Sequence, residues 1–376
     1  MFRLNTVGFD ESLAFSGRGA EKNNFLMNLF LQNEEEDKRL KELYKLNPTA
    51  FEKEIAHTKK RLLTDLDEFI ISEKPSEAFI HIALANINYN YYSRKELYLS
   101  SKKKANNNNK IKYPENFFTY RDSLDLNDNT LKNYYTYHQF INRYLDNLAY
   151  QSHTKKEPTF NKISYWHQTQ KLRLIDSLIT NKQLHDNLLH NTVKRYLVHA
   201  DDSQKEHDLV ALFKNLDHNE AHQKDVERYA YNTSKINAGE LIPNLALITV
   251  KNVITSLQKI NDSKTVFFFW DTKSVKHYKE IHVRISDLKT KYPEYAFVGI
   301  NTGTDFSAWN QTVISSGYNQ ANEYQLKNST AAKNALFINS ANKAMIVDKG
   351  GIILEGNSNL FKQNFESLLL GYLNKK

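Results

Sequence analysis

The distribution of glycine constrains the fold of this chain more than any other feature of its sequence. No glycine occurs between Gly19 and Gly239, and the seven others that follow end at Gly371. Glycine is costly inside helices and is needed in turns, so a gap of about 220 residues is typical of packed helices. The 376 residues are enough for two domains with separate cores. We therefore predict an α-helical domain over 20–236 and a domain of a different kind over 237–376.

Apolar residues within 20–236 recur with a period close to 3.6, as they do on the buried face of an amphipathic helix. Two such stripes consist of Leu62, Leu63, Leu66, Phe69 and Ile70, and of Tyr134, Tyr137, Ile141, Tyr144, Leu145 and Leu148. Asn47-Pro48 and Pro75-Ser76 each indicate a helix start, because a capping residue or proline precedes the apolar pattern. No fixed sequence period supports a repeat array.

Residues 1–19 form a separate segment with a strand-like pattern. Phe2 and Leu4, and later Leu13 and Phe15, alternate weakly with polar residues. A lone strand is unstable. We therefore expect this segment either to pair with another part of the chain or to be the remnant of a β-region that this sequence does not include.

After Gly239, short apolar runs alternate with amphipathic segments. Thr265–Trp270 is β-branched and aromatic, which is typical of a strand buried on both faces. We predict a further strand over 295–300 and a hairpin over 343–354 that turns at Gly350-Gly351. Helices are predicted over 274–291, 306–316 and 358–373. This order, β-α-β-α-β-β-α, implies a mixed sheet flanked by helices.

The charge of the chain is moderately basic and evenly distributed. Lys and Arg number 51 against 43 Asp and Glu, which gives a formal net charge of +8. The excess is +5 in 239–376 and +3 in the remainder, so we expect no face specialised for nucleic acid. No apolar run is long enough to predict a transmembrane helix, and no signal peptide is visible.

Cysteine is absent from the chain. Its absence excludes disulfides, thiolate nucleophiles, thiolate-bound zinc and iron–sulfur clusters. Any activity must therefore come from other side chains or from binding alone.

Several segments of the C-terminal part resemble one known family. They are Leu241–Leu247, Phe268–Thr272, Lys279–Ile281, Val298–Asn301, and Ile346–Lys349 with Gly351-Ile352. These segments resemble the thioredoxin-fold domain of the TlpA-like thiol–disulfide oxidoreductases, cell-envelope proteins common in Bacteroidetes with extra N-terminal domains. The resemblance covers about 240–376 and implies a thioredoxin-like fold there. Residues 15–24 are similar to the helical regions that precede such domains.

The catalytic positions of that family hold other residues in this chain. The resemblance places Ser274 and His277 at the two positions of the Cys-x-x-Cys motif, where the amides of a helix N-terminus stabilise a thiolate. The family's cis-proline falls near Asn342-Lys343, and no proline follows Pro293. A serine hydroxyl does not ionise near neutral pH and forms no exchangeable bond with sulfur. The resemblance therefore does not carry oxidoreductase activity to this chain.

What the resemblance implies is a redox-inactive protein of the cell envelope, on its periplasmic side, with a binding or assembly role. The surface expected to contact a peptide or partner protein consists of Trp270, Asp271, Lys273, Ser274, His277, Asn342 and Lys343. No cofactor is implied. Because no export signal is visible, this location requires a leader or a lipoprotein anchor outside the sequence given.

Two other classes of function remain open at this stage. The first is an enzyme that works without thiols, either with Ser274 as nucleophile and His277 as base or with a metal held by His218 and His222, which lie one helical turn apart. The alternative is that Asp271, Thr272 or Ser274 caps a helix, that His277 is a solvated or packed side chain, and that the pair at 218 and 222 lies on a solvated face. The second class is a purely structural module whose cleft is filled by the helical domain.

Two further patterns have a plain structural explanation beside a functional one. The lysines of 102–104 could contact anionic lipid, but a solvated loop between helices is the simpler interpretation. The tyrosines at 89–98 and 134–137 could line a groove. Tyrosines at helical spacing are more often half-buried core residues.

Overall fold

The computed structural model describes residues 2–3, 13–105, 111–154, 156–157, 159–200 and 202–374. The chain packs into two compact units. One contains 1–193 and 212–219, and the other contains 194–211 and 220–376. The predicted boundary at 236–237 marks the change from helices to strands. In the structure, however, most of the helical residues from 194 to 236 pack with the strands that follow. The domain boundary itself stays a proposal.

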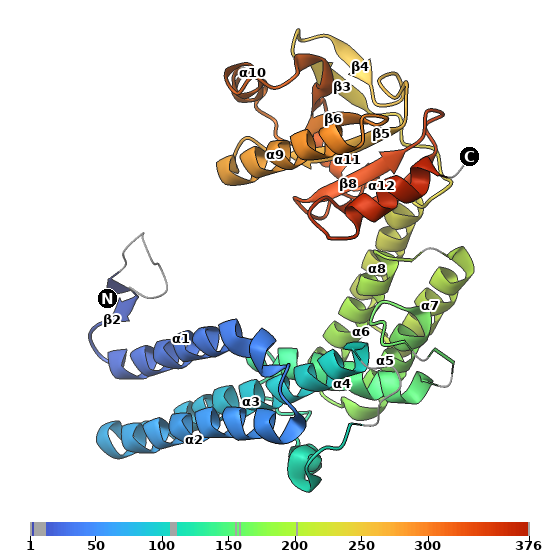
Figure 1. Cartoon of the computed structure of the whole chain (residues 1–376). Helices are drawn as coiled ribbons and strands as arrows, with labels where there is room; N and C mark the ends of the chain where they lie inside the picture. The colour runs from blue at the N-terminus through green and yellow to red at the C-terminus, as the bar shows by residue number, and fades with distance from the viewer. Residues whose placement is uncertain are drawn as a thin grey trace. The chain divides into compact units, whose positions relative to one another are not determined.

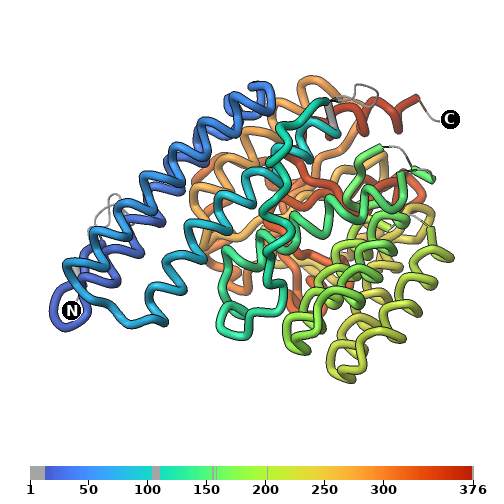
Figure 2. The backbone as a smooth tube through the Cα atoms, turned by 90° about the horizontal axis from the view of Figure 1, so that it is seen from below, coloured from blue at the N-terminus to red at the C-terminus, as the bar shows by residue number. Residues whose placement is uncertain are grey.

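The predicted helical region is confirmed. Its helices are α1 (Ala20–Leu43), α2 (Pro48–Glu73), α3 (Glu77–Ala105), the 3-10 helix η1 (Glu115–Ser123), α4 (Tyr135–His153), α5 (Tyr165–Leu178), α6 (Lys182–Leu197), α7 (Ser203–Leu216) and α8 (Glu220–Ser234). Helices α1, α2 and α3 lie side by side (Figures 1 and 2). The interface between them buries Leu62 and Leu66, with Phe25 and Phe69 packed against them. Leu62, Leu66 and Phe69 come from one of the periodic stripes of the sequence.

Local sequence explains where these helices begin. Asn47 is the N-cap of α2, and its side-chain oxygen accepts a hydrogen bond from the amide of Ala50 at 2.9 Å. Pro48 follows as the first helical residue, where its missing amide hydrogen costs nothing. Helix α3 begins at Glu77, directly after Pro75-Ser76. The two predicted helix starts are therefore confirmed.

The strand-like N-terminal segment finds a partner within the chain. Strand β1 (Phe2–Arg3) pairs antiparallel with β2 (Ala14–Phe15). The side chain of Asn24 on α1 bonds both the amide and the carbonyl of Phe15, at 2.8 and 3.0 Å. The intervening residues 4–12, over which the prediction also extended, lie outside the described residues.

The second unit is built on a mixed sheet. Its strands are β3 (Ala246–Thr249), β4 (Ile254–Ser256), β5 (Thr265–Trp270), β6 (Ala296–Asn301), β7 (Glu323–Leu326), β8 (Lys343–Val347) and β9 (Ile353–Asn359), in the order β4-β3-β7-β6-β5-β8-β9. Strand β5 is parallel to β6 and antiparallel to β8, which forms a hairpin with β9. A β-α-β unit followed by such a hairpin and a helix is the thioredoxin arrangement. The predicted fold class is therefore confirmed.

Helices cover both faces of this sheet. They are α9 (Val275–Lys291), α10 (Phe306–Ser315), the 3-10 helix η2 (Gln320–Asn322), α11 (Ser329–Ala335) and α12 (Phe365–Leu373). One core places apolar residues of α9, α10 and α12 against Val266 and Phe268 of β5. The other core places α11 against Phe267 and Phe269, with Tyr229 of α8 packed beside it. The alternating side chains of β5 thus enter both cores, and Figure 1 shows α9 and α12 on the near side of the sheet.

Some elements of this unit differ from the prediction. Strand β9 continues to Asn359, so the last helix begins at Phe365 and not near 358. The β3–β4 hairpin, β7 and α11 were not predicted. Each of these strands, like the helix, is at most seven residues long, and such short segments carry little periodicity.

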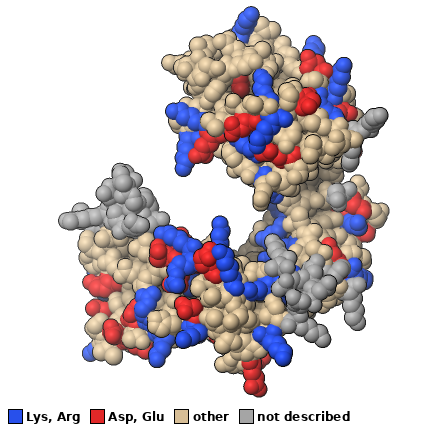
Figure 3. Space-filling view, in the orientation of Figure 1, with Lys and Arg blue, Asp and Glu red and all other residues tan. Residues whose placement is uncertain are grey.

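The surface carries both signs of charge. On the face shown in Figure 3, Lys and Arg side chains interleave with Asp and Glu. Among the described helices, none is long and apolar enough to cross a membrane.

The segment after α8 is held along β9. The Gly239 amide donates to the Ile353 carbonyl and the Ile353 amide donates to the Glu240 carbonyl, both at 2.8 Å. Gly356 on β9 makes a close approach possible, because a Cβ atom there would lie 1.7 Å from the carbonyl oxygen of Ile236. A Cβ atom on Gly371 in α12, by contrast, would have no other atom within 4 Å.

We expect opposite effects from alanine at these two glycines. Gly356→Ala must displace the backbone at Ile236 and should lower the free energy of unfolding of the second unit by about 2–3 kcal/mol. Gly371→Ala should raise it by about 0.5–1 kcal/mol, because alanine is favoured in a helix. Denaturant unfolding of both variants, with hydrogen exchange at the Gly239 and Ile353 amides, tests this. Unchanged exchange in Gly356→Ala would contradict it.

Candidate functional site

The N-terminus of α9 carries the positions of the lost thiols. Ser274 is the N-cap residue, but its side chain makes no capping hydrogen bond and is exposed. The preceding turn is closed by Asp271, whose side chain accepts from the Lys273 amide at 3.0 Å and whose carbonyl accepts from the Ser274 amide at 3.2 Å. These contacts close the turn before α9 but do not cap the helix, because Lys273 and Ser274 precede its first residue, Val275. The interpretation in which a side chain of this turn caps the helix is therefore wrong for Asp271 and for Ser274, whose hydroxyl stays available.

The structure brings His277 and Asn342 together across 65 residues of sequence. The His277 Nε2 atom lies 3.0 Å from the Asn342 Oδ1 atom. An amide oxygen only accepts, so Nε2 carries the hydrogen in this contact. His277 is thus bonded to the loop before β8, and no hydrogen bond joins it to Ser274 within the described part of the chain. This geometry does not provide the serine–histidine pair that a hydrolase needs.

Two predicted surface residues are buried. The Trp270 side chain, at the end of β5, is in the core on the side of α9 and is 2 % exposed. Lys343 is 1 % exposed, and its Nζ donates to the Phe337 carbonyl at 3.1 Å and to the Asn357 side chain at 3.3 Å. The expectation that these two side chains lie on the surface is therefore wrong. Both residues belong to central strands whose two faces are covered.

A buried polar cluster lies beneath this region, and the sequence did not reveal it. Glu323, the first residue of β7, is 4 % exposed. Its Oε2 accepts from the Trp270 indole nitrogen at 3.0 Å, and its Oε1 lies 3.2 Å from Nε2 of His282. The His282 ring stacks on the Tyr318 ring, with centroids 3.6 Å apart.

The hydrogen bonds of this cluster fix how many protons it holds. The His282 Nδ1 atom is 2.7 Å from the Tyr278 carbonyl and must donate to it. A single further proton then lies between Nε2 and the Glu323 carboxyl group, so the pair is neutral overall. Burial raises the pKa of Glu323, and the hydrogen bonds from His282 and Trp270 only partly oppose this. Because both ring nitrogens are occupied, His282 has none left to act on a ligand.

Gly299 explains how the carboxylate fits. It pairs with Glu323 across β6 and β7, and a Cβ atom on it would lie 2.3 Å from Glu323 Oε2. A glycine in the middle of a buried strand indicates a close approach. The Gly299 within the predicted strand over 295–300 was therefore a signal for this site. Nothing in the sequence indicated which side chain makes the approach.

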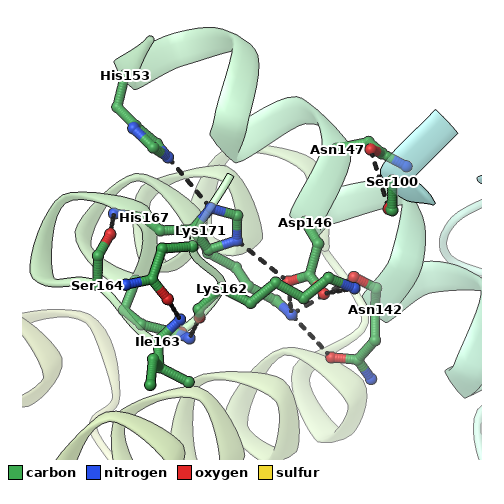
Figure 4. A network of polar contacts seen from close by, with 12 residues as sticks. Ser100, Asn142, Asp146, Asn147, His153, Lys162, Ile163, Ser164, His167 and Lys171 are labelled. Atoms are coloured by element: carbon green, nitrogen blue, oxygen red, sulfur yellow. Dashed lines mark hydrogen bonds and ion pairs between the residues drawn. The ribbon is translucent and has the colours of Figure 1, made fainter. Parts of the chain in front are cut away.

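The helical unit has its own buried polar network, between α4 and α5 (Figure 4). Asp146 accepts from Lys171 at 2.6 Å and pairs with Lys162 at 3.0 Å and with His167 at 3.4 Å. Burial alone would raise the pKa of Asp146, but the Lys171 charge and the His167 hydrogen bond outweigh it and hold the pKa well below its usual range. The ionised carboxylate requires a hydrogen on His167 Nε2. The other nitrogen of His167 then accepts from His153, 3.1 Å away.

The Asp146 carboxylate is held by partners within the helical unit. Lys171 of α5 contacts both Asp146 and Asn142 of α4, and Asp146 also pairs with His167 of α5 and with Lys162. The network therefore holds α4 and α5 together. Among the described residues, no group of three or more His, Asp or Glu is arranged to hold a metal ion. The pair His218 and His222 is therefore not part of such a group.

Three tyrosines of the tyrosine-rich segments are core residues, as the simpler interpretation held, whereas Tyr135 is exposed. Tyr98 and Tyr137 are fully buried and Tyr89 nearly so. The hydroxyls of Tyr98 and Tyr137 donate to the carbonyls of Leu46 and Asp125, at 2.8 and 2.9 Å. These rings therefore do not line a groove. The lysines of 102–104 belong to α3, so their interpretation as a loop is wrong, and 106–110 lie outside the described residues.

Comparison with known proteins gives matches among solved structures only. No family model and no curated protein matches the chain. A thioredoxin-like protein from Bacteroides caccae is 12% identical over 61% of this chain and 93% of its own, with a TM-score of 0.35. The thioredoxin domain of a thiol–disulfide oxidoreductase from Bacteroides vulgatus is 17% identical over 36% of this chain and 98% of its own, with a TM-score of 0.29.

A third similar structure is a thiol:disulfide interchange protein from a Bacteroides species. It is 17% identical over 37% of this chain and 88% of its own, with a TM-score of 0.29. All three likenesses cover only part of the chain, which lacks the cysteines of a Cys-x-x-Cys motif. The thioredoxin-like fold of the second unit therefore rests on its own strand order.

Proposed function

We propose that the second unit is a redox-inactive, thioredoxin-like binding module of the cell envelope. Its binding surface consists of Ser274, His277, Asn342 and the backbone of Ala341, with Asp271 and Lys273 at its edge; we call it the former thiol surface. Its ligand is an extended segment of a peptide or partner protein. The sequence resemblance to TlpA-like proteins supports the envelope location and this kind of ligand.

The single observation that carries the proposal is the contact between His277 and Asn342. It joins the first turn of α9 to the loop before β8, so that the two elements form one surface. Beside it, the backbone N–H and C=O of Ala341 make no hydrogen bond within the described part of the chain, and this residue is exposed. Free backbone groups of this kind pair with an extended polypeptide. The second unit itself leaves Ser274 exposed, which favours a binding surface over an occluded cleft.

We expect peptides selected on the full chain from a random displayed library to bind the former thiol surface. Ser274→Arg places a long side chain on that surface and should weaken their binding at least about tenfold. N-methylation of the central peptide bonds should weaken it as well, because backbone hydrogen bonds are lost. Titration of labelled peptide by fluorescence anisotropy measures both effects.

The matched control is Ser315→Arg, at an exposed serine near the end of α10. It adds the same side chain and should leave peptide affinity unchanged. Equal affinity of wild type and Ser274→Arg would remove the former thiol surface from consideration.

A further inference from the structure

A pocket lies beside α9, separate from the former thiol surface. Its volume is about 550 Å³, and it opens between α9 and the segment that leads into β7. None of the residues of the former thiol surface lines it. A volume of this size is typical of sites for small organic molecules.

The walls of the pocket are largely apolar. Ile285 of α9 and Phe297 of β6 are buried beneath it, and Val283 at its side is 65 % exposed. The Tyr318 ring forms part of the opposite wall. An apolar ligand body placed against these walls is itself removed from water and covers the exposed Val283, which is the main source of affinity in such a site.

The only carboxylate among the residues that line the pocket is neutralised. It belongs to Glu323, whose partner His282 also lines the pocket, and the pair shares one proton. Both nitrogens of His282 and both oxygens of Glu323 already have partners. Glu323 and His282 form the polar floor of the pocket. They therefore neither repel an anion nor compete for the hydrogen bonds of a ligand.

Two lysines of α9 give the pocket a positive edge. Lys279 and Lys289 line it, are exposed, and make no ion pair or hydrogen bond within the described part of the chain. Neighbouring lysines of the same helix are paired, Lys276 with Glu280 and Lys291 with Glu366. Unpaired cations beside an apolar pocket with a neutral floor complement an anionic head on an apolar body.

We propose that this pocket binds a small amphipathic organic anion, with its aliphatic or aromatic body against Ile285, Phe297 and Tyr318 and its anionic head beside Lys279 or Lys289, which lie about 15 Å apart along α9. The apolar walls provide most of the affinity. The lysines distinguish an anion from a neutral molecule of the same shape. This site is independent of the peptide-binding role proposed above.

The test uses the full chain and two probes with the same body, decanoate and decanol. Each is measured by its displacement of the fluorescent anion 1-anilinonaphthalene-8-sulfonate. Decanoate should bind more tightly than decanol to the wild type. The double variant Lys279→Gln/Lys289→Gln should bind decanoate about tenfold more weakly and decanol equally well.

Two further variants establish whether the probes bind in this pocket and whether the position of the lysines matters. Lys251→Gln/Lys349→Gln makes the same change in net charge at exposed lysines that do not line the pocket, and should bind decanoate as the wild type does. Ser286→Trp fills the pocket with an indole and should abolish binding of both probes, with an unchanged circular dichroism spectrum as evidence of folding.

Three outcomes would overturn the proposal. Equal decanoate affinity in the two lysine double variants would show that the head is not bound at Lys279 or Lys289. Undiminished binding by folded Ser286→Trp would place the probes elsewhere. A concentration-dependent dimer in sedimentation that Ser286→Trp dissociates would show that a second copy of the chain covers this pocket.

Discussion

Glu96→Leu should lower the free energy of unfolding of the helical unit by about 3 kcal/mol, because it leaves a largely buried guanidinium without its counterion. Glu96 on α3 is fully buried. Arg121 of η1 bonds both of its carboxylate oxygens, at 2.7 and 2.8 Å. Asn147 of α4 donates to the same carboxylate at 2.6 Å. One side chain thus connects three elements of the unit.

A second substitution, at Arg121, tests whether the loss is electrostatic. In Glu96→Leu/Arg121→Leu no charge is left unpaired, so most of the lost stability should return. Glu35→Gln is the matched control, because its ion pair with Lys38 is about two-thirds exposed on both sides, and it should change nothing measurable. Urea unfolding followed by circular dichroism at 222 nm measures all three. A loss in the double variant as large as in Glu96→Leu would contradict an electrostatic origin.

Lys343→Met should remove a pH dependence of stability that the wild type shows above pH 7. Burial lowers the pKa of Lys343 to about 7, and Glu355 opposes this only in part. Below pH 7 the lysine is charged in both the folded and the unfolded state, and the cost of burying the charge is fully present. Above pH 7 the folded state loses the proton while the unfolded state keeps it up to about pH 10.5. Stability therefore rises with pH across this window.

The expected rise in the free energy of unfolding follows from the pH range between the folded and unfolded pKa values of Lys343. Between pH 7 and 9.5 the wild type should gain about 3 kcal/mol relative to Lys343→Met, at about 1.4 kcal/mol for each pH unit. Denaturant unfolding of the second unit at several pH values measures the difference. Lys349→Met, at an exposed lysine in the β8–β9 turn, is the control and should follow the wild type. If Lys343→Met shows the same rise with pH as the wild type, the buried ammonium is not its cause.

The features that local sequence predicted share one physical basis. Helix α9 and strand β5 appeared within one or two residues of their predicted bounds, because periodicity and the flanking residues specify each of them. The start of α2 at Asn47-Pro48 is a local capping event. Strand β7 was missed because its four residues are specified by the strands on either side of it, β6 and β3. Such pairing cannot be deduced from the segment alone.

The candidate site shows the same division. The loss of both cysteines was evident from the sequence, and so was the place of Ser274 and His277 at the start of a helix. The burial of Lys343 was not, because a basic residue at a strand end can face either the core or the solvent. Trp270 was assigned both to a buried strand and to the binding surface, and the structure decided for the strand. The pocket beside α9 was not foreseen either, since its residues come from segments that only the folded sheet places together.

The sequence by itself determined that this protein is helical in its first part, mixed in its second, and without any sulfur chemistry of the thioredoxin kind. Residue types and neighbours a few positions away are sufficient for those conclusions. Only the tertiary structure decided which polar groups meet. His282 meets Glu323 across 41 residues and His277 meets Asn342 across 65. Such pairings depend on strand register and helix packing, which are set by the hydrophobic core as a whole.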